Sequence, residues 1–69
     1  MTTFNDANQA KLSLKMMLHH YYFYHSAMVI IEPDGDFGVM ILVHGLDDRV
    51  RKIVPNVHLG ASVHISNAK

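Results

Sequence analysis

The stretch "SAMVIIEPDGDFGVMILVHG", residues 26–45, places an apolar run on each side of the turn sequence "EPDGD". Proline suits the second position of a type I turn, and Gly35 can adopt the left-handed conformation that a bulged turn requires. The stretch therefore predicts a β-hairpin. Pairing Glu32 with Asp36 across the turn sets the register of all the residues that follow.

In this register both faces of the hairpin are apolar. One face pairs Ile31 with Phe37, Val29 with Val39 and Ala27 with Ile41, and the other pairs Met28 with Met40, Ile30 with Gly38 and Ser26 with Leu42. An antiparallel sheet that is covered on one side only usually has polar residues on its wet side. Either a later helix or the aromatic segment covers the second face, or that face contacts a partner, and the sequence leaves both alternatives open.

Apolar residues before the hairpin recur at three- and four-residue steps, which predicts an amphipathic helix of about four turns. Thr3 or Asn5 is expected to cap its first turn. The predicted apolar face comprises Ala7, Ala10, Leu14, Met17, Leu18 and Tyr21, opposite Asn8, Lys11, Lys15 and His19. Four consecutive aromatic residues at positions 21–24 favour extended structure, so we expect the helix to end within "HHYYFYH".

Gly45 interrupts the second strand, and apolar residues at helical spacing then predict a short helix that ends before Pro55. The alternating segment "VHLGASVHIS", residues 57–66, predicts a half-buried strand, bent or bulged at Gly60. Its expected inward residues are Val57, Leu59, Ala61, Val63 and Ile65. The prediction is a small single α+β domain over residues 1–69, in the order α-β-β-α-β. It has an antiparallel hairpin, at least one further strand, and the N-terminal helix packed on one sheet face.

Composition limits both the stability and the classes of function. The chain has 69 residues, no cysteine, and six basic and six acidic residues, which gives a formal net charge of zero. Disulfides and thiolate metal sites are excluded, so the stability of such a small core depends on packing, on a metal site without thiolates, or on self-association. No stretch has the charged and apolar pattern of a signal peptide, and the longest strictly apolar runs are far shorter than a membrane span. We expect a cytoplasmic protein without membrane contact.

No set of residues predicts catalysis, so we expect a protein that is not an enzyme and uses no cofactor. "LVHGL" and "DFG" each match a fragment of an enzyme motif, but the other parts of those motifs do not occur. The histidines do not have the spacing of a simple metal site, so no metal ligands are predicted. A metal site would need a cluster such as His20, His25 and His44, and a histidine-based metal or pH-responsive protein remains a further alternative.

A small nucleic-acid-binding module is another alternative, because aromatic side chains stack on bases and basic side chains bind phosphates. The candidate residues are Lys11, Lys15, Tyr22, Tyr24, Arg49, Arg51 and Lys52. A net charge of zero argues against it, since phosphate contacts supply most of the affinity in such proteins.

The favoured interpretation uses the second apolar face of the hairpin, with partner-binding residues Met28, Ile30, Met40 and Leu42. Methionine side chains adapt to irregular partners and are common on binding surfaces. We therefore expect a small interaction protein of accessory, regulatory or inhibitor type, which binds another protein and forms a homodimer.

Overall fold

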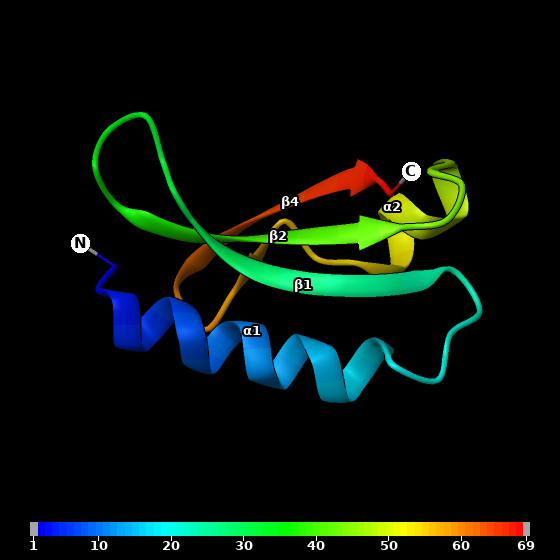
Figure 1. Cartoon of the computed structure of the whole chain (residues 1–69), viewed down its shortest axis with the longest axis horizontal. Coiled ribbons are helices and arrows are strands. Elements are labelled where there is room, and N and C mark those ends of the chain that lie inside the picture. The colour runs from blue at the N-terminus through cyan, green and yellow to red at the C-terminus, as the bar shows by residue number, and fades with distance from the viewer. Residues whose placement is uncertain (1, 69) are drawn as a thin grey trace.

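Helix α1 (Phe4–Leu18) packs across one face of a four-stranded mixed sheet in the computed structural model, which describes residues 2–68 (Figure 1). The chain continues through β1 (Tyr24–Ile31), β2 (Phe37–Val43), helix α2 (Asp48–Ile53), β3 (Val57–His58) and β4 (Ala61–Asn67). The strands lie in the spatial order β1-β2-β4-β3. The predicted α+β class, with its helix, hairpin, helix and C-terminal strand, is confirmed.

The hairpin of β1 and β2 has the predicted register. All six predicted pairs are present, from Ser26 opposite Leu42 to Ile31 opposite Phe37. At the turn, the Glu32 amide donates to the Asp36 carbonyl at 2.6 Å, and Gly35 has the expected positive φ of 92°. Alternation of side chains then assigns each residue of the hairpin to one of two faces.

The first helix begins at the predicted cap, because the Thr3 hydroxyl accepts a hydrogen bond from the Asp6 amide at 3.1 Å. The helix buries Ala7, Ala10, Leu14 and Leu18. The expectation that Met17 joins this buried face is wrong, since its side chain is 45 % exposed. Leu14 and Leu18, four residues apart, form the row that faces the sheet, and Met17 lies to one side of that row.

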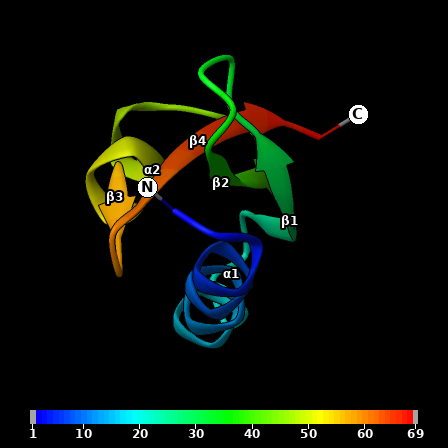
Figure 2. The ribbon, with the colours of Figure 1, turned by 90° about the vertical axis from the view of Figure 1, so that its left-hand side faces the viewer.

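Strand β4 is parallel to β2, so the chain must cross over between them, and the segment that contains α2 makes this connection. Asp47 caps α2 by accepting from the Val50 amide at 3.0 Å. Val50 and Val54 are buried in the same core as Leu14 and Leu18. Both helices therefore cover one face of the sheet, below and to the left of the strands in Figure 2.

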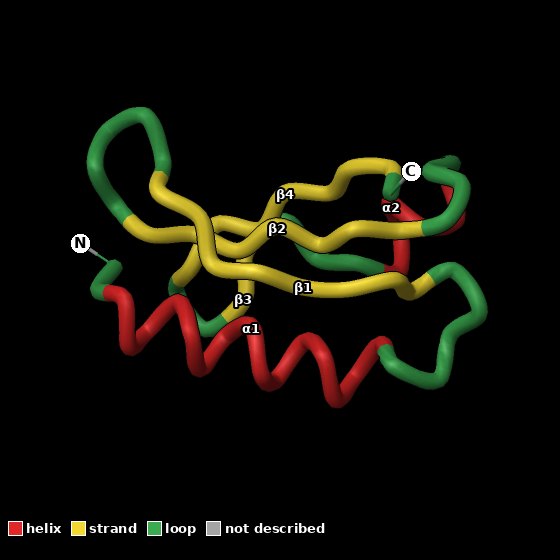
Figure 3. The backbone as a smooth tube through the Cα atoms, viewed as in Figure 1, coloured by secondary structure: helices red, strands yellow, loops and turns green. Residues whose placement is uncertain are grey.

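The C-terminal segment forms two strands where the sequence predicted one. Strands β3 and β4 form a tight hairpin whose two-residue turn is Leu59, with φ of 50°, and Gly60, with φ of 82° (Figure 3). Two consecutive residues with positive φ are typical of a type I′ turn. The expectation that Val57 and Leu59 face the core is wrong, because the turn leaves them 58 % and 63 % exposed.

The aromatic segment completes the core. Phe23 is 2 % exposed and packs with the buried residues of α1, β2 and α2, and its ring stacks on that of Tyr21 with centroids 5.1 Å apart. The second helix and the aromatic segment thus cover the face that α1 already covers. The alternative in which one of them covers the methionine face of the hairpin is excluded.

Candidate partner-binding face

We call the sheet surface opposite the helices the open face. Pairing along β1, β2 and β4 assigns its members, which are Ser26, Met28, Ile30, Gly38, Met40, Leu42, His64 and Ser66. The four residues predicted to bind a partner, Met28, Ile30, Met40 and Leu42, lie together at its centre. No helix of residues 2–68 lies on this side, to the right of the strands in Figure 2.

Exposure separates the two faces of β2, whereas both faces of β1 are partly exposed and Ile31, on the helix-covered face, is 70 % exposed. On the helix-covered face, Val39, Ile41 and Val43 have no exposed surface. On the open face, Met28 is 43 % exposed, and Ile30, Met40 and Leu42 are half-buried by their neighbours within the sheet. The centre of the open face is therefore a group of four contiguous apolar side chains in contact with solvent.

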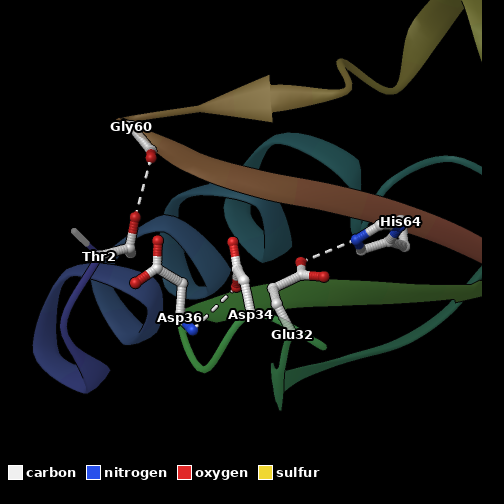
Figure 4. A network of polar contacts seen from close by, with 6 residues as sticks. All are labelled: Thr2, Glu32, Asp34, Asp36, Gly60 and His64. Atoms are coloured by element: carbon white, nitrogen blue, oxygen red, sulfur yellow. Dashed lines mark hydrogen bonds and ion pairs between the residues drawn. The ribbon is translucent and has the colours of Figure 1, made fainter.

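A hydrogen bond between His64 and Glu32 borders this apolar centre. The Nε2 of His64, on β4, donates to Oε1 of Glu32 at 2.7 Å (Figure 4). Glu32 follows β1 and reaches His64 across β2, because Gly38 of β2 has no side chain at the crossing point. A Cβ at Gly38 would contact the Glu32 carboxylate and would lie 3.1 Å from the Ser62 carbonyl oxygen. The glycine in "DFG" thus makes room for the hydrogen bond between Glu32 and His64.

Two further polar contacts lie near this hydrogen bond. The Asp34 carboxylate accepts from the Asp36 amide at 3.0 Å, and the Thr2 hydroxyl donates to the Gly60 carbonyl at 3.1 Å (Figure 4). Thr2, Asp34 and Asp36 line a shallow hollow of about 260 Å³ together with Glu32 and His64. The first contact lies within the β1–β2 turn, and the second joins the N-terminal segment to the β3–β4 turn.

A pair of histidines borders the other end of the open face. Nδ1 of His25 lies 3.2 Å from Nε2 of His44. If the register continued unchanged, His25 would pair with Val43 and face the helices, but a β-bulge pairs Tyr24 with Val43 instead. A bulge re-aims side chains, and here it brings His25 to His44. Sequence spacing did not reveal this contact, although the predicted register already placed positions 24 and 44 opposite each other.

The residues of the nucleic-acid alternative lie on four separate parts of the chain. Lys11 and Lys15 are on α1, and Tyr22 is 82 % exposed in the segment that follows α1. The other three basic residues are on α2, and Tyr24 begins β1. Arg51 and Lys52 line a shallow hollow of about 500 Å³ together with Asn56 and His64. Tyr24 packs against the core, and its burial raises the pKa of its hydroxyl above 10.0. A half-buried ring offers less stacking surface than this alternative assumed.

The remaining histidines lie apart from the open face or within local contacts. His19 and His20 follow α1, with ring centroids 5.7 Å apart, and His58 forms a 2.9 Å hydrogen bond with the Ser13 hydroxyl. Within residues 2–68, no three side chains of the metal-ligating types are placed to hold one ion. Over the same residues, neither helix combines the length and the apolar character needed to cross a bilayer.

No protein-family model matches the chain, and no curated protein or solved structure shows significant similarity to it.

Proposed function

We propose that this chain is a small non-enzymatic interaction protein that binds other protein surfaces through the open face, with a second copy of itself as a partner. The observation that supports the proposal is the contrast between two faces of one hairpin. Val39 and Ile41 of β2 are fully buried, while Met40 of β2 and its partner Met28 of β1 contact solvent on the other face. Exposed apolar patches of this kind usually mark contact surfaces.

Self-association suits the distribution of charge on this face. A two-fold interface presents the same patch twice, so an unpaired charge at its centre would meet its own copy. The open face has no lysine, arginine or aspartate among its members. At the border of the face, the Glu32 carboxylate accepts a hydrogen bond from His64 within the same chain.

The free energy available for dimer formation through the open face is moderate. Burial of ~500 Å² of apolar surface supplies on the order of 12 kcal/mol, before an association cost of about 4–15 kcal/mol. With an association cost at the low end of this range, about 4 kcal/mol, the balance corresponds to a dissociation constant on the order of micromolar. Methionine contributes here because its unbranched side chain can repack against different partners.

Sedimentation equilibrium between ~10 and ~300 μM tests the proposal. The wild-type chain is expected to change from monomer to dimer over this range, and Met28→Lys is expected to remain monomeric because a lysine ammonium cannot be buried without a partner. Met16→Lys is the matched control, since Met16 is 74 % exposed on α1 and lies on the other side of the molecule.

Two results would overturn the proposal. One is a wild-type chain that remains monomeric at every concentration. The other is a dimer that Met28→Lys leaves intact, which would assign the contact to another surface, such as the free edge of β1. Thermal denaturation of each variant shows that a loss of association is not a loss of folding.

A further inference from the structure

The two imidazoles at the end of the open face meet through ring nitrogens. Nδ1 of His25 and Nε2 of His44 lie 3.2 Å apart, the ring centroids are 4.8 Å apart, and the ring planes are inclined by 78°. Both residues are exposed, so an ion in solution can reach both nitrogens. Imidazole is the protein ligand best suited to zinc, copper and nickel.

Their separation is that of two ligands on one metal ion. Two nitrogens that each lie about 2.0–2.1 Å from a tetrahedral zinc ion are themselves about 3.3 Å apart. At a right-angled coordination geometry the corresponding distance is about 2.9 Å. The observed 3.2 Å lies between these values, so the two ligands need only a rotation of the rings to direct both lone pairs at one ion.

The backbone holds this arrangement in place. The His44 amide donates to the Phe23 carbonyl at 2.7 Å, next to the paired residues Tyr24 and Val43. On the other side of β2, the Ala68 amide donates to the Val43 carbonyl at 2.7 Å. A pre-formed pair of ligands loses little conformational freedom when an ion binds, which favours binding by both rings at once.

We propose that His25 and His44 form a binding site for a divalent transition metal ion, with Zn²⁺ as the ion in the test below. The ligands are Nδ1 of His25 and Nε2 of His44, and water molecules fill the other positions, because the described residues bring no third ligand to the pair. Both ligating nitrogens must be free of protons. The hydrogen shared between them moves to the far nitrogen of its own ring, so that Nε2 of His25 and Nδ1 of His44 carry the protons.

This site does not depend on the proposed self-association, because it uses contacts within one chain. The metal site and the self-association can also be refuted independently of each other. Met28→Lys removes the apolar contact and leaves both histidines in place, so its zinc affinity is expected to match that of the wild type. Alanine at His25 removes a metal ligand and leaves the four central apolar side chains unchanged.

Isothermal titration of the chain with ZnCl₂ in a buffer without chelating groups tests the site. The wild type is expected to bind one ion per chain with a dissociation constant on the order of micromolar to tens of micromolar. His25→Ala and His44→Ala are each expected to bind at least ~10-fold more weakly, since the second ligand acts at a high effective concentration. The control is the double variant His19→Ala/His20→Ala, which removes two exposed adjacent histidines and keeps the pair.

Nitrogen NMR of the imidazole rings gives a second readout on the wild type. Zinc is expected to shift Nδ1 of His25 and Nε2 of His44, and to leave the rings of His19 and His58 unshifted at one equivalent. The site is overturned if the two single alanine variants bind zinc as the wild type does. It is equally overturned if the affinity falls in the His19→Ala/His20→Ala control.

Discussion

Leu59 occupies a backbone conformation that a leucine rarely adopts. Its φ of 50° lies in the left-handed region, as does that of Gly60 beside it, and its side chain is 63 % exposed. An L-residue with a Cβ loses roughly 1–2 kcal/mol in this region, whereas glycine loses none. We therefore predict that glycine is more stable than alanine at position 59.

The magnitude follows from two opposing effects. Relief of the left-handed conformation stabilises the glycine variant by roughly 1–2 kcal/mol. The greater freedom of glycine in the unfolded chain removes about 0.4–1 kcal/mol of that gain. The Leu59→Gly variant should therefore exceed Leu59→Ala by about 0.5–1 kcal/mol in free energy of unfolding. Comparison with alanine cancels the packing of the leucine side chain, which both substitutions remove.

Urea denaturation followed by circular dichroism measures this difference, and for a chain of this size 1 kcal/mol also shifts the melting temperature by about 4–8 °C. The same pair of substitutions at Gln9 is the control, because Gln9 is exposed within α1, where the backbone is helical. There glycine is expected to be less stable than alanine by about 1 kcal/mol. If alanine equals or exceeds glycine at position 59, the left-handed turn is not present in solution.

Two further predictions concern the open face and the core beside it. Gly38→Ala should lower the free energy of unfolding by about 1–3 kcal/mol, since its methyl group meets the Glu32 carboxylate and the Ser62 carbonyl. In denaturation experiments, Glu32→Ala made together with it should restore part of that loss, and strictly additive losses would contradict the contact. Burial raises the pKa of Tyr24, so the folded state holds the phenolic proton more tightly than the unfolded state. Stability should therefore fall as the pH rises above 10.0 and fall less steeply in Tyr24→Phe, as measured by denaturation at several alkaline pH values; equal slopes would refute this.

Local chemistry was enough to predict the hairpin. Pro33, Asp34 and Gly35 specify one turn, and a turn of known length sets every pair behind it, so Met28 opposite Met40 followed directly from the sequence. The Thr3 cap was predictable for the same reason, because the interaction spans only three residues.

The alternation of apolar and polar residues led to a wrong prediction for residues 57–65, because it does not show the turn at Leu59 and Gly60. Residues 57–65 alternate between apolar and other side chains without a break, which is the pattern of one strand. The reversal at Leu59 and Gly60 leaves the alternation intact on both sides and changes the direction of the chain. Leucine is not a residue that predicts positive φ, so only Gly60 marked the site, and a bend was the simpler interpretation.

Sequence reasoning named His25 and His44 in a possible cluster with His20, but it could not predict the geometry of their contact. A bulge inserts one residue into a strand and shifts all later residues relative to the partner strand. The pattern of apolar residues around Tyr24 does not show where this insertion occurs, and four aromatic residues in a row conceal it. Without the bulge His25 and His44 would lie on opposite faces, and with it their nitrogens lie 3.2 Å apart.

Topology explains why the open face stays open. A crossover between parallel strands places its helix on one side of the sheet, and the N-terminal helix packs on that same side. Both helices and the aromatic segment therefore pack on the side of the sheet where Val39, Ile41 and Val43 are buried. Residues 2–68 contain no further segment to cover Met28 and Met40, so burial of these methionines requires surface from another molecule. The two histidine contacts at the borders are satisfied within the chain, which confines that requirement to the four apolar side chains at the centre.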